Sequence, residues 1–155
     1  MLTRKSRLLL SLSTAPLLFV AACTDNTLTN PFEEAVGTYH LTVYQGGTLP
    51  RTYTIQPNDP NYPNLPGGGT LVATDGTLVL YNNRTFIETN NYTVTPNGGT
   101  AQPSYFVSQG TWTMNGIDLT LEAQGRIVNG TLDVDTIHYQ ELDANGILQS
   151  YEYMR

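Results

Sequence analysis

The chain of 155 residues contains one cysteine, one lysine and one tryptophan, and only 13% of its residues are charged. A single cysteine excludes an internal disulfide, so the fold must be stabilised by packing. Beyond residue 22 the chain carries four arginines against thirteen acidic residues, a net charge of −9. Such a surface repels phosphate groups, which argues against nucleic acid as a partner and against electrostatic binding to a membrane.

Motifs for reaction chemistry are also missing. The sequence contains no Gly-x-Ser-x-Gly elbow, no His-Glu-x-x-His pair and no phosphate-binding glycine loop. His40 and His138 alternate with apolar neighbours, which predicts exposed positions, and Asp133 and Asp135 are expected on a solvated strand face. We therefore predict no enzymatic activity, no metal site and no cofactor.

What the N-terminus does contain is a targeting pattern. Arg4, Lys5 and Arg7 precede an apolar segment over residues 8–20, which as a helix would be about 20 Å long. This is too short for a hydrocarbon core of about 30 Å, so the segment is typical of a signal peptide. Ala21, Ala22 and Cys23 follow it, and small residues directly before a cysteine resemble the lipobox of bacterial lipoprotein signal peptides.

The resemblance implies that Cys23 receives a diacylglyceryl group, that residues 1–22 are removed, and that the membrane is contacted through this lipid. Thr24 follows the cysteine where an aspartate would signal retention, which favours the outer membrane, facing the periplasm or the cell surface. Residues 23–34 are polar and predict a lipidated tether. The alternative is a buried cysteine beside an ordinary cleavage site.

Residues 35–155 are rich in Thr, Tyr, Val, Ile and Leu with frequent Gly and Asn, a composition typical of strands and turns. In the segment 117–123 every odd-numbered residue is apolar, as one buried sheet face requires. Asn115-Gly116 predicts a type I′ hairpin turn, and three other pairs repeat this signal: Asp75-Gly76, Asn129-Gly130 and Asn145-Gly146. We predict an all-β domain without helices, an antiparallel up-and-down β-barrel of about eight to ten strands, each about five to nine residues long.

Two short features make this barrel similar to the lipocalin and calycin group. Gly37-Thr38-Tyr39 resembles the Gly-x-Trp motif that opens the first lipocalin strand, with tyrosine in place of tryptophan, and Arg155 ends the last strand. The resemblance implies that Gly37, Tyr39 and Arg155 close the barrel, the cation lying on the aromatic ring, a contact worth about 0.5 to 2 kcal/mol. The second lipocalin signature and the C-terminal helix are absent from the sequence.

The segment 57–69, PNDPNYPNLPGGG, has a period of three residues. A polyproline II helix has the same period, so the four prolines would lie on one edge and Asp59, Tyr62 and Leu65 on another. The segment is either a semi-rigid flap at the barrel mouth, with Tyr62 and Leu65 turned towards a ligand and Gly67 to Gly69 as a hinge, or a solvated excursion.

Two functions follow from this fold. The first is a membrane-anchored carrier that holds a small hydrophobic or amphipathic molecule against the inward residues Phe86, Phe106, Trp112 and Met114. The second is a filled barrel that serves as an envelope spacer or as a protein-binding module with an unidentified partner.

A Cys23→Ala variant tests the lipid anchor. Without the thiol there is no acceptor for the diacylglyceryl group. In a bacterial host fed labelled palmitate, we therefore expect the variant protein to carry no label and to be found in the soluble fraction. Unchanged membrane association of the variant would contradict the lipoprotein signal.

Overall fold

The computed structural model describes residues 31–155; the predicted signal peptide, Cys23 and the tether up to residue 30 lie outside this range. The described residues form one short helix, α1 (Pro31–Ala35), and ten strands. The strands are β1 (Gly37–Tyr44), β2 (Gly47–Thr48), β3 (Arg51–Ile55), β4 (Gly69–Leu80), β5 (Thr85–Pro96), β6 (Gln102–Asn115), β7 (Asp118–Ala123), β8 (Arg126–Asp133), β9 (Thr136–Leu142) and β10 (Leu148–Met154). Over the same range no helix has the length and hydropathy of a membrane span.

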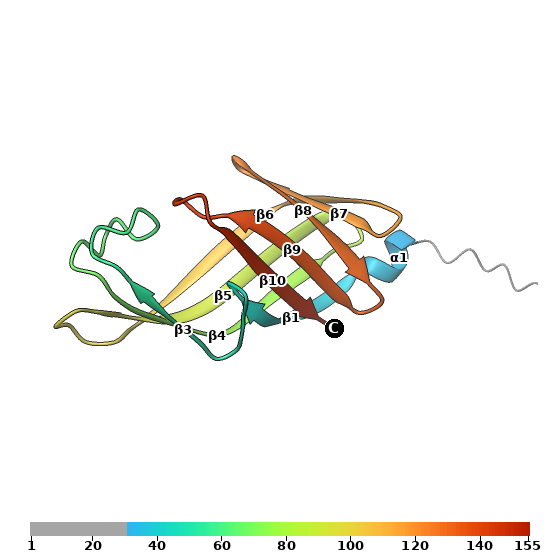
Figure 1. Cartoon of the computed structure of the whole chain (residues 1–155). Helices are drawn as coiled ribbons and strands as arrows, with labels where there is room; N and C mark the ends of the chain where they lie inside the picture. Colours follow the sequence, from blue (N-terminus) through green and yellow to red (C-terminus); the bar gives the residue numbers. More distant parts are fainter. Residues whose placement is uncertain (1–30) are drawn as a thin grey trace, which may run out of the picture.

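Eight of the strands close into an antiparallel barrel (Figure 1). From β4 to β10 each strand pairs with the next in sequence, and β1 pairs with β10 on one side and with β4 on the other. The short strands β2 and β3 lie between β1 and β4 in sequence and pair with the neighbouring ends of those two strands. The predicted all-β, up-and-down antiparallel barrel is confirmed.

Strands β4, β5 and β6 are 12, 12 and 14 residues long, which exceeds the predicted length. Their additional residues continue beyond the barrel, where β3 pairs with the first residues of β4 and the first half of β6 pairs with β5 alone. Together they form a sheet extension at the left of Figure 1. The two ends of the barrel therefore differ, because the sheet extension continues beyond only one of them.

Helix α1 closes the end without the extension, although the sequence predicted no helix. The ring of Phe32 stacks on Trp112 with centroids 4.7 Å apart, and the Arg84 guanidinium lies 4.3 Å from the centre of the Phe32 ring. The Trp112 indole N–H donates to the carbonyl of Tyr81 at 3.0 Å. Glu33 and Glu34 in the first turn suit the helix dipole, but five residues are too few to make a helix without this packing. Residues 31–34, assigned to the tether, thus belong to the helix.

Two of the four predicted turns are wrong. Asp75-Gly76 lies inside β4 beside a β-bulge, and Asn129-Gly130 lies inside β8. A Cβ at Gly76 would collide with Asn90 Oδ1, and one at Gly130 would collide with the carbonyl of His138. These glycines permit close approach within the sheet, a role that a local sequence pattern does not distinguish from a turn.

The other two pairs lie in hairpin turns, as predicted. Between β6 and β7 the central residues are Gly116 and Ile117, and Gly116 alone has a positive φ, at 63°. This is the pattern of a type II′ turn, so the predicted type I′ is wrong. In the β9–β10 turn Gly146 has a φ of 75°.

A Phe32→Ala variant tests the closure by α1. Loss of the ring removes its stacking and the apolar area it buries, so we expect the free energy of unfolding in urea to fall by about 2 kcal/mol. The emission of Trp112, the chain's one tryptophan, should shift to longer wavelength as water reaches it. Tyr105→Ala, at a side chain that is 73% exposed, is the control and should change neither value. An unchanged stability and emission in Phe32→Ala would contradict this account.

Candidate functional site

The chain between β3 and β4, residues 56–68, is here called the excursion. Its backbone N–H groups donate every third residue: Asp59 to Gln56, Tyr62 to Asp59, Leu65 to Tyr62 and Gly68 to Leu65, at 2.8 to 3.2 Å. A polyproline II helix has no such internal bonds, so that prediction is wrong, whereas the period of three residues is confirmed. The excursion is a series of consecutive turns.

The two edges of the excursion that the period predicted differ in burial. The four prolines are exposed, Asp59 is buried, and Tyr62 and Leu65 are half-buried against the core. The carboxylate of Asp59 accepts hydrogen bonds from the Asn61 backbone and side chain and from the Tyr53 hydroxyl. The hydrogen bonds of Asp59 and the packing of Leu65 therefore keep the edge with Asp59, Tyr62 and Leu65 turned towards the core.

The excursion also contacts the β9–β10 turn on the other side of the barrel end. The backbone N–H of Ala144 donates to Asn61 Oδ1 at 2.6 Å, and Asn145 Nδ2 lies 3.4 Å from Asp59 Oδ1. Where the excursion joins β4, a Cβ at Gly68 would collide with the Ile55 carbonyl, and a Cβ at Gly69, the first residue of β4, would collide with the Thr95 carbonyl. The excursion thus spans the barrel end and is attached on both sides.

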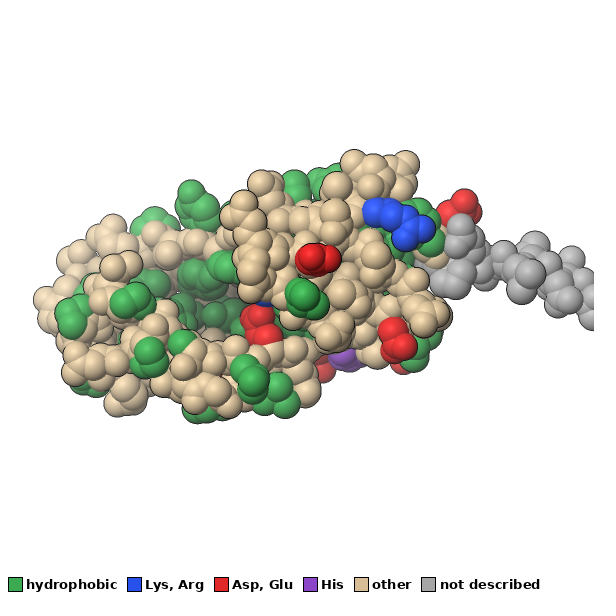
Figure 2. Space-filling view, turned by 90° about the horizontal axis from the view of Figure 1, so that it is seen from above, with side chains coloured by type: hydrophobic (Ala, Val, Ile, Leu, Met, Phe, Trp, Pro, Cys, Tyr) green, Lys and Arg blue, Asp and Glu red, His purple; other side chains and the backbone are tan. Residues whose placement is uncertain are grey.

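Between the excursion and the sheet extension lies an apolar groove of about 400 Å³. Its wall includes Tyr62, Leu65, Leu71, Tyr92, Val94 and Pro103. Figure 2 shows hydrophobic side chains at the bottom of a recess in this part of the surface. The groove has the volume of a site for a small organic molecule, which is typically about 300 to 1,000 Å³.

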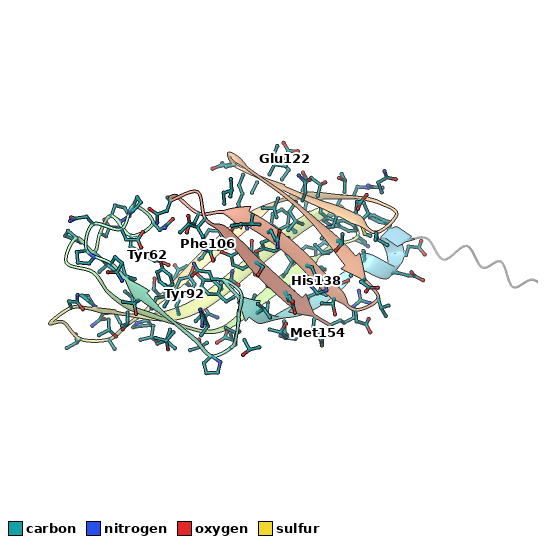
Figure 3. The ribbon with its side chains drawn as sticks, in the orientation of Figure 1. Tyr62, Tyr92, Phe106, Glu122, His138 and Met154 are labelled. Carbon is teal, nitrogen blue, oxygen red and sulfur yellow. The ribbon has the colours of Figure 1, made fainter. Side chains whose placement is uncertain are left out.

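Next to the groove the barrel interior opens into a smaller cavity of about 110 Å³, here called the mouth cavity. It is lined by Tyr44, Glu88, Asn90, Tyr92, Phe106, Glu141 and Tyr151. Tyr92 lines both spaces, so the mouth cavity and the groove are neighbours. Figure 3 shows Tyr62, Tyr92 and Phe106 at this end of the molecule.

One residue that lines the mouth cavity, Glu88, has its carboxylate buried inside the barrel. Glu88 Oε1 accepts from the Tyr139 hydroxyl at 2.5 Å and lies 2.8 Å from the Tyr153 hydroxyl, while Oε2 pairs with Arg126 Nη1 at 2.7 Å. Arg126 Nε in turn donates to Glu141 Oε2 at 2.8 Å. A buried charge requires such partners, and two carboxylates share one guanidinium here.

The surroundings shift the acidity of several groups. Burial raises the pKa of Tyr139 and of Tyr153 well above the ordinary tyrosine value, and the charge of Glu88 raises both further. Burial also raises the pKa of Tyr44, Tyr92 and Tyr151. Burial by itself would lower the pKa of Arg126, but Glu88 and Glu141 raise it above its ordinary value. Arg126 therefore stays a cation, and the tyrosines are neutral donors at neutral pH.

The structure separates the residues predicted to contact a ligand. Tyr62 and Leu65 line the groove and Phe106 lines the mouth cavity. Phe86 and Trp112 are buried at the closed end of the barrel. Met114 lies at that end too, beside Glu34 and Arg155. The first three therefore lie at the open end of the barrel, and the other three lie at the closed end.

The residues predicted to close the barrel are in contact. The Arg155 guanidinium lies 4.8 Å from the centre of the Tyr39 ring, and Arg155 Nη2 donates to the Tyr39 hydroxyl at 2.5 Å and to the Glu34 carbonyl at 2.6 Å. A Cβ at Gly37 would lie 3.1 Å from the same nitrogen, so a glycine leaves room for the arginine. This contact joins β1 and the C-terminus to helix α1.

Sequence reasoning missed every residue of the mouth cavity except Phe106, and it also missed the neighbouring Arg126; the missed lining residues are Tyr44, Glu88, Asn90, Tyr92, Glu141 and Tyr151. A signal was present, because Glu88 and Asn90 have the parity of Phe86 and Tyr92 and hence face inward on β5. A charged residue on the apolar face of a strand is a candidate for a buried polar site.

The histidines and acidic residues considered for chemistry lie elsewhere. His40 and His138 are exposed, as predicted, and His138 Nδ1 lies 3.6 Å from Glu152 on the outer wall. Asp133 and Asp135 are exposed as well. Among residues 31–155 no three metal-ligating side chains are grouped in a way that could hold an ion.

Comparisons of the chain with protein-family models, with curated proteins and with solved structures found no match. The lipocalin-like relationship and the lipoprotein signal therefore stay predictions.

The buried tyrosines predict a loss of stability at alkaline pH. In the unfolded chain tyrosine ionises near pH 10, about the value in peptides, whereas the raised pKa keeps Tyr139 and Tyr153 protonated in the fold. Their contribution is fully present below about pH 10 and is lost above it, because the unfolded state then binds fewer protons. Between about pH 9 and about pH 12 the free energy of unfolding in urea should therefore fall, most steeply above about pH 10, by up to about 1.4 kcal/mol per pH unit for each tyrosine.

In a Tyr139→Phe variant the dependence of the unfolding free energy on pH should be weaker by the contribution of one tyrosine, up to about 1.4 kcal/mol per pH unit. A free energy of unfolding that does not change over this pH range would contradict the burial of these hydroxyls.

Proposed function

We propose that this chain is a membrane-anchored lipoprotein of the bacterial envelope that holds a small hydrophobic or amphipathic molecule at the open end of its lipocalin-like barrel. The observation that carries the proposal is the groove beside the mouth cavity. Its volume of about 400 Å³ suits the body of a small ligand, and Leu65, Leu71 and Val94 offer it an apolar wall.

The closed end argues for the same site. Phe32 and Trp112 fill that end of the barrel, so the space for a ligand lies at the opposite end, under the excursion (Figure 1). The mouth cavity of about 110 Å³ is too small for a complete ligand of this kind and suits a small polar head group. The ligand would thus lie mainly outside the barrel, in the groove.

The position of α1 gives the anchored protein an orientation. A lipid on Cys23 would be joined to α1 by residues 24–30, which reach at most about 25 Å when fully extended. Helix α1 lies at the closed end, so a membrane-anchored barrel would direct its mouth away from the membrane. In this orientation the mouth would be accessible to a ligand from the periplasm or from a partner.

The second candidate is the filled, non-catalytic envelope module. It is favoured by the packed interior, where Trp112, Tyr39, Tyr153 and Phe86 are fully buried and Glu88 is satisfied by protein groups. Such a module would bind no small molecule.

Probe binding distinguishes the two candidates. Signal-cleaved protein purified in detergent and then exchanged into detergent-free buffer should bind an apolar fluorescent probe, and native mass spectrometry should find a co-purified small molecule. Leu65→Asn, which places a polar group in the groove, should weaken probe binding about tenfold, or about 1.4 kcal/mol. Tyr105→Ser, on the exposed outer face of β6, is the matched control and should bind as the unmodified protein does. No probe binding at all would favour the filled module.

A further inference from the structure

We propose that the mouth cavity binds the positively charged nitrogen of an organic ammonium ligand whose apolar part lies in the groove. This inference rests on the proposed function and names the class of ligand. It is argued from the aromatic rings, the charge balance and the connection between the two spaces.

The walls of the mouth cavity are aromatic on several sides. Tyr44 meets Tyr151 edge-on, with centroids 5.5 Å apart and planes at 84°, and it meets Tyr92 at 6.1 Å and 51°. Phe106 belongs to the same cavity. Rings set at such angles surround a small volume with both faces and edges. An organic cation is attracted to aromatic faces, by about 0.5 to 2 kcal/mol for each ring depending on desolvation.

The charge of the cavity is negative. Glu88 and Glu141 both line it, and both pair with the single guanidinium of Arg126, so one negative charge remains uncompensated. The excursion and the β9–β10 turn add Asp59 and Asp143 near Tyr62, on the groove side. The excess negative charge would repel an anionic head group. A neutral head group would leave this charge unbalanced, whereas a cationic head group would balance it.

Arg126 does not already occupy the proposed position. Its guanidinium lies 5.6 Å from the centre of the Phe106 ring and 5.7 Å from that of Tyr139, on the side of Glu88. Of the other three arginines within residues 31–155, Arg84 and Arg155 contact Phe32 and Tyr39 at the closed end. Arg51 lies against Gly47 of β2. No arginine is among the residues that line the mouth cavity in the described structure.

The connection through Tyr92 sets the form of the ligand. A head group between Tyr44, Tyr92 and Tyr151 would have its substituent directed past Tyr92 into the groove, where Leu65 and Val94 lie. A compact ammonium group on an aliphatic or aromatic body therefore fits both spaces, whereas a free ammonium ion would use only one.

The experiment compares three ligands with the same decyl chain, decyltrimethylammonium, decanol and decyl sulfate, each below its micelle concentration, by isothermal titration calorimetry on the signal-cleaved protein. We expect decyltrimethylammonium to bind at least about tenfold more tightly than decanol, and decyl sulfate to bind most weakly. Tetramethylammonium ion, tested alone, should bind at least about a hundredfold more weakly than the decyl compound. Added salt should reduce the preference for the cation.

Two variants locate the preference. Glu141→Gln keeps an acceptor for Arg126 Nε but removes the excess charge, so the ratio of ammonium to decanol affinity should fall about tenfold. Tyr92→Leu removes an aromatic face and should lower the same ratio. Glu152→Gln, which removes one charge from the outer wall, is the matched control and should leave the ratio unchanged. Circular dichroism of each variant checks that the barrel is folded.

The possible outcomes separate this inference from the proposed function. Equal binding of all three decyl compounds, or tighter binding of the sulfate, would overturn the ammonium inference and leave the carrier proposal standing. If Glu152→Gln removes the preference for the cation as fully as Glu141→Gln does, the preference arises from the general surface charge. This result would also overturn the inference. No binding of any of the three would overturn both.

Discussion

A carboxylate inside a small barrel must be paired, and much of this structure is arranged around that requirement. Glu88 on β5 is reached by Arg126 from β8, by Tyr139 from β9 and by Tyr153 from β10, so the network joins opposite walls of the barrel. A buried ion pair is weak evidence for stability, since well-packed apolar residues often replace it without loss. Its role here is to set the register, because a slip of one residue would turn Glu88 out of the barrel and leave Arg126 without its partner. The same network holds Arg126 beside Glu141 and so determines the charge at the mouth.

The interior changes in character along the barrel. At the closed end it is filled, because Phe32 from α1 adds a ring to the side chains of the strands. In the middle, the hydroxyls of Tyr139 and Tyr153 satisfy the carboxylate. At the mouth, Tyr62 and Leu65 of the excursion line the groove and not the mouth cavity, which is therefore left open. Closure at one end and an incomplete filling at the other place the candidate site.

Part of this site could be read from the sequence. The period of three residues in the excursion correctly predicted that Asp59, Tyr62 and Leu65 share an edge. The spacing alone decides which residues lie on the same side of a segment with this period. The conformation was wrong, because backbone hydrogen bonds every third residue satisfy the same period. For the glycines, the local pattern of Asn115-Gly116 and of Asn129-Gly130 is the same. Only the neighbouring strand shows that Gly130 permits the approach of His138 and makes no turn.

The sequence by itself determined the all-β class, the antiparallel meander and the alternation of inward and outward residues, since each depends on residues that are only a few positions apart. The tertiary structure alone decided that β1 closes on β4, that a short helix covers one end, and that a negatively charged aromatic cavity opens at the other. The partners of Glu88 lie 38, 51 and 65 residues away in the chain. Contacts of that separation exist only after the sheet has closed, and no local pattern encodes them.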